Sequence, residues 1–191
     1  MRRVLLLASD KGELKGFGDE YLKAITGVGP VMAAATAAMY IERYKPDLVV
    51  NVGSAGAVLE SLNVGDAYSF STIVTPDQNL SAFHVKLGST LDDKRTTVGA
   101  LSSLDSESGL VLGSSGTFYK TIQGWHKDMS VDSADMEGYG VAVACVKAGV
   151  PFLCIKLITD KLGDGSSVGK INFNLRAGRE NLIDLVKTKL A

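Results

Sequence analysis

The sequence predicts an α/β fold with three layers, in which a mixed, mostly parallel and twisted sheet carries helices on both faces. Short apolar runs, typical of strands buried on both faces, alternate along the chain with helical segments. Two of the helical segments are rich in small residues, which allow a helix to lie close to a sheet. No internal repeat and no linker interrupts the 191 residues, so we expect one domain over residues 1–191.

The first half of the chain is expected to contain strands at residues 4–8, 22–26, 48–52 and 66–74. The second of these is the weakest, and the alternation in the fourth favours a longer strand near a sheet edge. Pro30 suits the first turn of a helix over residues 31–44, because its missing N–H costs nothing there. The third strand leads into a glycine-rich turn at residues 53–56.

The second half is expected to contain strands at residues 110–114 and 152–158. The polar stretch 84–108 is interpreted as loops with one weak strand. A helix is expected over residues 137–147, with Gly149 at its C-cap, where a positive φ is needed. A loop rich in glycine and serine, at 163–169, leads to one C-terminal helix with a single apolar stripe.

Composition argues against several classes of protein. The formal net charge of −1 leaves no basic field for nucleic acid or a membrane surface, and no apolar run could span a bilayer. The apolar run at 4–8 is too short for a secretion signal, so a cytoplasmic protein is expected. Cys145 and Cys154 lie in apolar stretches and are interpreted as reduced core residues. Because His84 and His126 are far apart, we expect no metal site, and we expect no organic cofactor.

Candidate site residues follow four of the expected strands. Ligands of open α/β sheets bind beyond the carboxyl ends of the strands. The residues found there, in chain order, are Asp10, Glu13, Ser54, Phe118, Tyr119 and Asp160. Together they predict one cleft that holds carboxylates, a hydroxyl and aromatic rings, which suits the cleavage of a nucleoside.

A dinucleotide-binding fold is a weaker interpretation. Gly27 and Gly29 begin its glycine fingerprint, but Met32 stands where the third glycine belongs. Asp47 has the spacing of a ribose-binding acid, yet it precedes a strand instead of ending one. This interpretation is therefore disfavoured.

Five segments resemble one known family, the methylthioadenosine/S-adenosylhomocysteine nucleosidases and their phosphorylase relatives in the nucleoside phosphorylase superfamily. They are TGVGPVMAA at 26–34, KPD at 45–47, NVGSAGA at 51–57, ADME at 134–137, and VPF through ITD at 150–160. The segments occur in the family's order and cover most of the chain. The resemblance implies that fold, a small-molecule nucleoside as ligand, and a homodimer in which a neighbouring subunit completes the pocket.

The resemblance implies catalytic roles for Asp160, Glu13 and Glu137, and substrate contacts for Ser54, Phe118, Tyr119, Met136 and Thr159. Asp160 would protonate the leaving base at N7, and Glu137, beside Met136, would accept the ribose 2′ and 3′ hydroxyls. Phe118 would stack on the base, and Ser54 would lie near the nucleophile. Glu13 would activate water if one inserted residue is allowed after Ala8; Asp10 is near enough to compete.

Physical chemistry agrees with that division of roles. N-glycosidic cleavage passes through an oxocarbenium-like transition state, so one group neutralises the leaving base while another positions water on the opposite face. The general acid must stay protonated near neutral pH, which needs a pKa raised by apolar surroundings. Asp160 ends an apolar run. Lys156 lies on the same face by alternation but roughly 13 Å away, too far to hold Asp160 in its charged form.

Hydrolysis is favoured over phosphorolysis. Phosphorylases hold a phosphate dianion with arginines, and Asn51 stands where purine phosphorylases carry one. The loop at 8–13 is acidic, which suits water and repels phosphate. The segment at 114–119 resembles uridine phosphorylase slightly more, but the Gln-x-Arg that binds uracil does not follow it, and Asp160 favours a purine.

The leading hypothesis is therefore hydrolysis of a 5′-substituted adenosine such as methylthioadenosine or S-adenosylhomocysteine. Alternatives are a futalosine hydrolase, a phosphate-dependent nucleoside phosphorylase for purines or uridine, and a non-catalytic nucleoside-binding module. Each site residue also has an ordinary structural explanation: Asp160 as an N-cap, Glu137 as a first-turn helix carboxylate, and Glu13 as a solvated loop acid. Trp125 is interpreted as structural. Shortened segments at 14–25 and 84–108 leave the base preference open.

Overall fold

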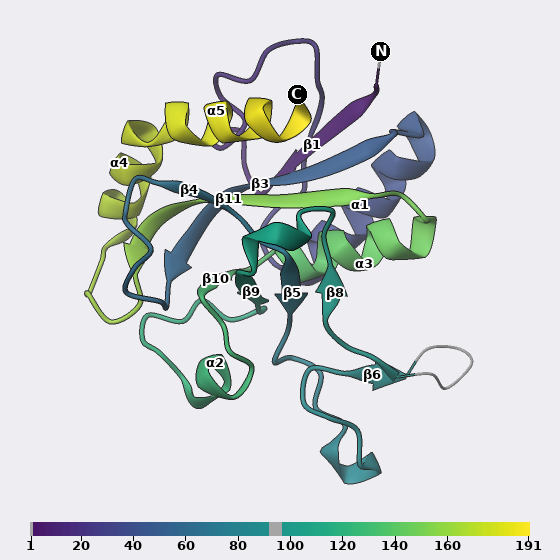
Figure 1. Ribbon diagram of the computed structural model, residues 1–191, viewed down its shortest axis with the longest axis vertical. Helices are drawn as coiled ribbons and strands as arrows, with labels where there is room; N and C mark the ends of the chain where they lie inside the picture. Colours follow the sequence, from purple (N-terminus) through teal and green to yellow (C-terminus); the bar gives the residue numbers. More distant parts are fainter. Residues whose placement is uncertain (1, 92–96) are drawn as a thin grey trace.

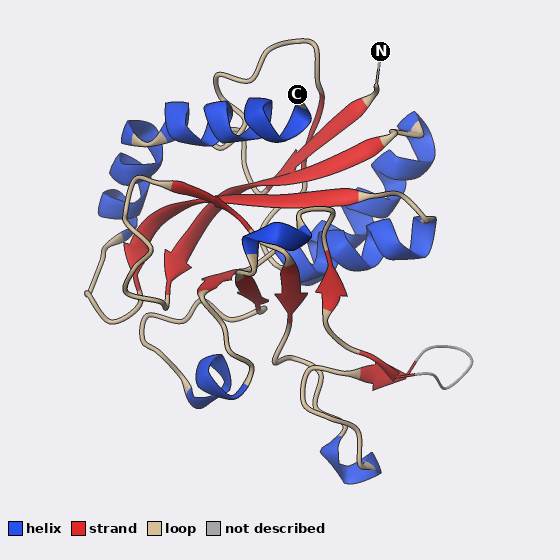
Figure 2. Ribbon diagram, in the orientation of Figure 1, coloured by secondary structure: helices blue, strands red, loops and turns tan. Residues whose placement is uncertain are grey.

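The computed structural model describes residues 2–91 and 97–191 and has three layers, a sheet between two pairs of helices (Figures 1 and 2). The strands are β1 (Val4–Ala8), β2 (Leu22–Ile25), β3 (Leu48–Ala57), β4 (Ala67–Ser69), β5 (Thr72–Val74), β6 (Thr90–Leu91), β7 (Thr97–Val98), β8 (Leu101–Ser102), β9 (Val111–Ser114), β10 (Ser133–Asp135) and β11 (Phe152–Lys161). The helices are α1 (Pro30–Tyr44), α2 (Gly124–Asp128), α3 (Gly138–Ala148), α4 (Val168–Ala177) and α5 (Arg179–Leu190), with 3₁₀ turns η1 (Ser81–Phe83) and η2 (Ser106–Ser108).

The main sheet is mixed and mostly parallel, as the sequence predicts. Its strand order is β2-β1-β3-β10-β9-β5-β8, and β11 pairs with both β3 and β4. Pairs β1–β2, β1–β3, β3–β11, β5–β9 and β9–β10 are parallel, whereas β3–β10, β4–β11 and β5–β8 are antiparallel. The parallel pairs bring the carboxyl ends of β1, β3 and β11 together. The short strand β10 runs antiparallel to the last residues of β3, so its own carboxyl end and that of β9 lie alongside them, and the candidate site is in this region.

Each face of the sheet carries its own core. On one face, α1 and α3 pack on side chains such as Leu5, Val49 and Cys154. On the other face, α5 packs Leu182 and Val186 on the alternate residues of the same strands. Because successive side chains of a strand point to opposite faces, a continuous apolar run supplies both cores, which is why β1 is an unbroken hydrophobic run and residues 152–158 of β11 are interrupted only by Lys156.

Two glycines let the helices approach one another and the sheet. A Cβ on Gly140 would lie 2.1 Å from the carbonyl oxygen of Pro30, so α3 crosses α1 in backbone contact. A Cβ on Gly138 would lie 2.8 Å from Leu112 of β9. The helix propensity that glycine loses, roughly 1 kcal/mol relative to alanine, is offset here by close packing.

Two expected strand boundaries are wrong. Residues 53–56 do not form a turn, because β3 continues through them to Ala57 and pairs with β11 from Val49 to Ala57. Residues 66–74 are not one strand near an edge. The chain bends at Phe70 and Ser71, whose N–H groups donate to Cys154 and Leu110 respectively, so β4 pairs with β11 and β5 pairs with β9.

The C-terminal helix is also not continuous. Gly178 separates α4 from α5, and a Cβ there would lie 2.8 Å from the carbonyl oxygen of Gly65 and 2.8 Å from Leu157. The break lets α5 turn onto the sheet while α4 approaches the end of β11 (Figure 1). In the described part of 84–108, the chain forms η2 and the short strands β6, β7 and β8, where the sequence predicts one weak strand.

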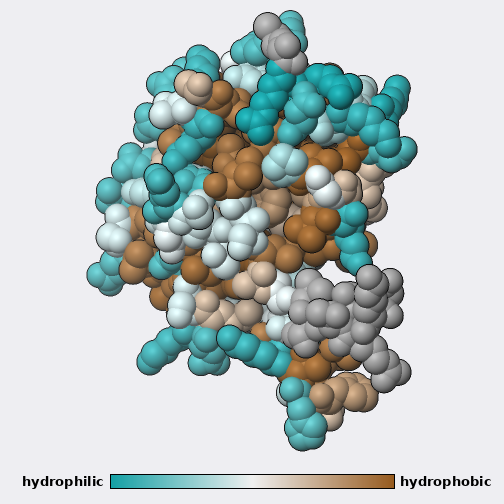
Figure 3. Space-filling view, turned by 45° about the vertical axis from the view of Figure 1, so that its right-hand side comes forward, coloured by the Kyte–Doolittle hydropathy of each residue, from teal (hydrophilic) through white to brown (hydrophobic). Residues whose placement is uncertain are grey.

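The cysteines, the length of the helices and the surface hydropathy can also be described. Cys145 and Cys154 are free and buried, as expected. None of the helices in the described residues combines the length and the apolar character that crossing a bilayer requires. On the face drawn in Figure 3, hydrophobic side chains gather across the middle, between hydrophilic surfaces above and below.

Candidate active site

A pocket of about 190 Å³ opens at the carboxyl ends of the central strands. Seven of the eight residues that the sequence predicts for the site line it, namely Ser54, Phe118, Tyr119, Met136, Glu137, Thr159 and Asp160. Ser9, Val28, Ser115, Thr117 and Trp125 are among its other lining residues. Glu13, the eighth predicted residue, lies behind the pocket wall and reaches it through hydrogen bonds.

Asp160 lies near the end of β11, at an irregularity in the ladder. Ile158 pairs with Ala55 and Asp160 pairs with Gly56, so Thr159 is an extra residue, a β-bulge. The Thr159 hydroxyl donates to Asp160 Oδ1 at 2.9 Å, and the Asn174 amide of α4 donates to the Thr159 carbonyl at 2.7 Å. Asp160 therefore belongs to a strand and is not an N-cap, and the bulge turns its side chain toward the pocket.

Burial is the main influence on Asp160. It raises the pKa of this carboxyl above its ordinary value, and the hydrogen bond from Thr159 opposes it only in part. The bulge at Thr159 also interrupts the alternation that would put Lys156 and Asp160 on one face. Lys156 pairs with Asp135 instead, which leaves Asp160 free of that cation.

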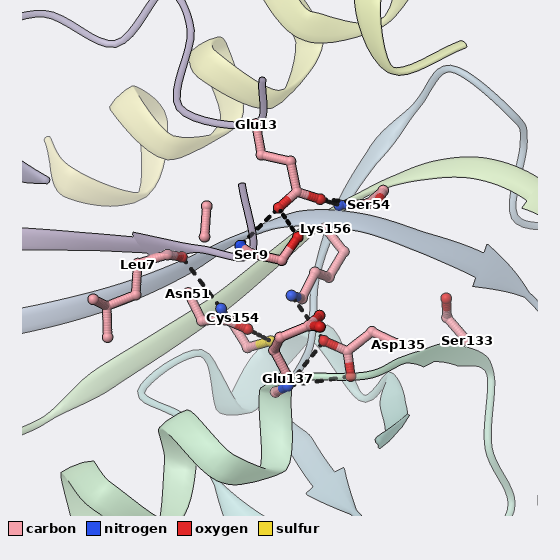
Figure 4. Close-up of polar contacts among 12 residues, drawn as sticks. Leu7, Ser9, Glu13, Asn51, Ser54, Ser133, Asp135, Glu137, Cys154 and Lys156 are labelled. Atoms are coloured by element: carbon pink, nitrogen blue, oxygen red, sulfur yellow. Dashed lines mark hydrogen bonds and ion pairs between the residues drawn. The ribbon is translucent and has the colours of Figure 1, made fainter. Parts of the chain in front are cut away.

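Glu137 stands at the N-cap position of α3 and points into a cluster of charges (Figure 4). It is 7% exposed, and its Oε1 accepts from the N–H of Gly29 at 2.9 Å. Gly29, the N-cap of α1, has a φ of 95°, a backbone conformation that glycine adopts readily. Burial, with the nearby charge of Asp135, raises the pKa of Glu137 to about 7, although Lys156 and the Gly29 N–H oppose them.

Asp135 and Lys156 form an ion pair in the interior beside Glu137. The Lys156 ammonium lies 2.8 Å from Asp135 Oδ2, and the two side chains are 1% and 0% exposed. Asp135 also accepts from the N–H of Gly138 at 2.9 Å. Burial alone would lower the pKa of Lys156, but the charge of Asp135 and smaller effects from its neighbours raise it above the ordinary value.

Glu13 is buried and is not a solvated loop acid. Its Oε2 accepts from the N–H and hydroxyl of Ser9 at 2.9 and 2.7 Å, and its Oε1 accepts from the N–H and hydroxyl of Ser54 at 2.7 and 2.9 Å (Figure 4). A Cβ on Gly53 would lie 2.8 Å from Glu13 Oε1, so β3 needs glycine where the carboxylate crosses it. Gly53 of the NVGSAGA segment therefore makes room for the Glu13 carboxylate and does not form a turn.

Asp10, the competitor of Glu13, occupies a different position. It is exposed and accepts from the N–H groups of Gly12 and Glu13 within its own loop. It does not line the pocket. The geometry therefore connects Glu13, and not Asp10, to the site.

Aromatic side chains form one wall of the pocket. Phe118 is 52% exposed, and Tyr119 lies 5.7 Å from Trp125 between ring centroids. Trp125 stacks on the buried ring of His126 at 3.8 Å. A Cβ on Gly113 would lie 2.7 Å from Trp125, so a glycine in β9 makes room for the indole.

Sequence reasoning missed the place of Trp125 in the pocket wall, because nothing local to Trp125 indicates which strand it meets. It also passed over Ser9, which follows β1 directly and could have been found by the same strand-end argument that found Glu13. Ser115 also lines the pocket but was not a predicted site residue, and its hydroxyl donates to Asp77 at 2.8 Å. Within residues 2–91 and 97–191, no group of three or more His, Cys, Asp or Glu side chains is placed to hold a metal ion.

Comparisons of sequence show which known proteins this chain resembles. Residues 11–191 match the model of a family described as the Phosphorylase superfamily. The 5′-methylthioadenosine/S-adenosylhomocysteine nucleosidase of Shewanella loihica is 26% identical over 92% of this chain and 82% of its own length. That of Geobacillus kaustophilus is 27% identical over 95% of this chain and 83% of its own length.

Comparisons of structure agree on the fold. The nucleosidase of the same name from Colwellia psychrerythraea, solved in complex with adenine, has a TM-score of 0.81 at 23% identity, covering 97% of this chain and 93% of that one. The futalosine hydrolase of Helicobacter pylori has a TM-score of 0.82 at 18% identity, covering 99% and 97%. Both chains are similar to this one over nearly their whole length, so the mixed, helix-flanked sheet is the fold they share.

Proposed function

This chain belongs to the phosphorylase superfamily, and from that premise we propose that it hydrolyses the N-glycosidic bond of a purine nucleoside and releases the free base. One observation carries the proposal. A single pocket joins Asp160, a carboxyl whose pKa is raised, with Glu137 and with the hydroxyls that Glu13 holds. Glycoside hydrolysis needs such a division between an acid for the leaving group and a carboxylate for the nucleophile.

The proposed substrate is a 5′-substituted adenosine, such as methylthioadenosine or S-adenosylhomocysteine. Curated relatives that align over most of this chain are named as nucleosidases for these compounds. The apolar part of the lining, which includes Val28, Leu162 and Ile171, would suit the thioether that both of these 5′ substituents share.

Asp160 is the proposed general acid. A carboxylic acid protonates the leaving base only if it keeps its own proton near neutral pH, and burial of Asp160 favours the protonated form. Phe118 and Tyr119 would hold the base against the same wall, with the ring of Trp125 beside Tyr119. Protonation at N7 then lets the base depart as a neutral molecule.

Glu137 and Glu13 have separate proposed roles. Glu137, beside Met136, would accept the ribose hydroxyls as a carboxylate. Glu13 would receive the proton of the attacking water by way of a serine: the Ser9 or Ser54 hydroxyl, which lines the cavity, would pass its own proton to Glu13 and take the proton of the water. The water attacks the anomeric carbon as the bond to the base breaks, which gives the free sugar and the free base.

Hydrolysis fits the pocket better than phosphorolysis. Of the described residues that line it, none is a lysine or an arginine. Asn51, at the position where purine phosphorylases carry an arginine, is buried, and its amide donates to the carbonyl of Leu7 at 3.2 Å. Lys156 is already paired with Asp135. A phosphate dianion would therefore meet carboxylates without a free cation.

We further propose a homodimer, a cytoplasmic location and a single domain. Exposed apolar residues of α1 support the dimer, because Val31, Met32 and Met39 are 79%, 55% and 57% exposed. The two free thiols suit a reducing compartment. Two cores on opposite faces of one sheet support one domain. Light scattering that shows a monomer would refute the dimer.

The test is incubation with methylthioadenosine, with and without phosphate, while free adenine and the sugar product are followed. We expect adenine and free methylthioribose without phosphate. Asp160→Asn should lower kcat by about 10²- to 10⁴-fold and leave ligand binding intact, whereas Asp184→Asn, on the exposed face of α5, should behave as the wild-type protein does. Product only with phosphate, as a sugar 1-phosphate, would refute hydrolysis. Turnover of futalosine alone would reassign the substrate.

A further inference from the structure

A fully buried charge pair lies against the proposed ribose-binding carboxylate. Lys156 comes from the middle of β11 and Asp135 from the end of β10, and their side chains are 1% and 0% exposed. In Figure 4 the Lys156 side chain points toward the carboxylates of both Asp135 and Glu137. The proposed mechanism assigns no role to either member of the pair.

Such a pair needs an explanation beyond stability. Removing two charges from water costs several kcal/mol per ion, and apolar residues of similar volume often replace buried pairs without loss. On its own face of β11, Lys156 lies between Cys154 and Ile158, which are 1% and 0% exposed and belong to the hydrophobic core. An apolar residue at 156 would thus suit the core, but it would supply no cation beside Glu137.

Glu137 is surrounded by groups from four segments. Asp135 of β10 and Glu13 of the loop after β1 carry negative charge, Lys156 of β11 carries positive charge, and the N–H of Gly29 points at the carboxylate from the start of α1. Lys156 is therefore the one full cation among the described groups that act on Glu137. Without Lys156, the buried Glu137 carboxylate would lie near two other acids, Asp135 and Glu13, with no cation to offset their charge.

We propose that Lys156, anchored by Asp135, is a positioning residue whose charge favours the charged form of the Glu137 carboxylate for ribose binding, an inference that rests on the proposed nucleosidase function. Asp135 holds the ammonium at 2.8 Å and so fixes its place beside Glu137. A charged Glu137 accepts hydrogen bonds from both ribose hydroxyls, whereas a protonated one would have to donate to one of them.

The two charges of the pair act on Glu137 with opposite sign. The charge of Asp135 raises the pKa of Glu137 and that of Lys156 lowers it, and burial is the largest influence of all. Substituting one member of the pair should shift the titration of Glu137 in one direction, and substituting the other should shift it in the opposite direction. If the pair only filled space or stabilised the fold, the two substitutions would not shift the pKa of Glu137 in opposite directions.

The experiment measures the titration of Glu137 by ¹³C NMR of ligand-free protein labelled at the glutamate carboxyls, with Glu137→Gln to assign the signal. Lys156→Met should raise the pKa of Glu137 by one unit or more, and Asp135→Asn should lower it. Asp135→Asn with Lys156→Met together should not raise it. Lys187→Met, on the exposed face of α5, is the matched control and should leave it unchanged.

Kinetics with methylthioadenosine supply the second readout. At pH 6.5, Lys156→Met should raise KM about tenfold for each unit gained in the pKa of Glu137, with a smaller change in kcat, and KM should recover as the pH is raised. Shifts in the same direction for both single variants, or a loss confined to kcat, would overturn the proposal. If Lys156→Met does not fold, Asp135→Asn still decides, because an unchanged or raised pKa there refutes it. A wild-type protein that cleaves no nucleoside would refute the proposed function, whereas the NMR titration would still decide how the pair acts on Glu137.

Discussion

Replacing Glu137 with glutamine should stabilise the fold at high pH while it abolishes ribose binding. The carboxyl is 7% exposed, and burial together with Asp135 raises its pKa from the ordinary 4.5 to about 7. The folded protein therefore binds this proton more tightly than the unfolded chain does. Glutamine keeps the shape and the oxygen that accepts from Gly29, but it carries no charge to be buried.

The magnitude follows from the difference between the two pKa values. Each unit of pKa corresponds to about 1.4 kcal/mol, so burying the charged form destabilises the native state by about 3 kcal/mol at pH values above 7. The sign is that of a raised acid: the penalty is absent below the unfolded pKa of 4.5 and grows as the pH rises through about 7. Between pH 5 and pH 8, Glu137→Gln should gain about 2 to 3 kcal/mol on the wild-type protein.

Urea unfolding at a series of pH values from 5 to 8.5 measures this gain, with m-values compared to confirm that the surface exposed on unfolding is unchanged. Glu180→Gln, at an exposed site in the first turn of α5, is the matched control, and its stability should follow the wild-type pH dependence. A difference between Glu137→Gln and wild type that stays constant with pH would show that Glu137 is not held in a desolvated, acid-rich site. The same variant should lose its affinity for nucleoside.

Three further predictions concern glycines and phosphate. Gly53→Ala should disturb Glu13, whose oxygen would lie 2.8 Å from the new Cβ, and lower kcat at least tenfold in steady-state assays; wild-type kcat would contradict this. Gly140→Ala should destabilise the fold by more than about 2 kcal/mol in urea titrations, because its Cβ would meet the carbonyl of Pro30 at 2.1 Å, whereas Gly124→Ala, with open space around it, should be nearly neutral; equal effects would refute the packing argument. Phosphate up to 50-fold over substrate should not raise the rate of base release, and a saturable increase would show a phosphate site.

Much of the fold follows from local patterns. The apolar runs of β1, β3 and β11 are dictated by burial on both faces, and a period of two residues supplies both cores. Within residues 48–52 and 152–158, Asn51 and Lys156 are the polar exceptions. The predicted boundaries fail where the chain meets a distant segment. The C-terminal helix breaks at Gly178, where the backbone packs closely on Gly65. Gly53 lies inside a strand and not in a turn, and a glycine is needed there because the Glu13 carboxylate lies against it. No window of neighbouring residues contains either contact.

The site residues also fall into two groups, those that local sequence patterns predict and those whose positions depend on distant contacts. Asp160 and Ser54 could be placed from the sequence, since each lies at or just beyond the carboxyl end of a predicted strand and the carboxyl ends of parallel strands converge. Trp125 could not, because its place depends on the glycine that β9 offers at Gly113. Nor could the partner of Lys156, since Asp135 lies on another strand and the bulge at Thr159 changes the alternation that local reasoning would extend.

The sequence by itself determined the layers, the strand ends that carry the chemistry, and the family resemblance of the motifs. The tertiary structure alone decided that Glu13 reaches the pocket through Ser9 and Ser54, and that Lys156 and Asp135 form a pair beside Glu137. The reason is physical. Periodic burial is a property of neighbouring residues, whereas the charge of a buried group depends on what distant strands bring within a few ångströms of it.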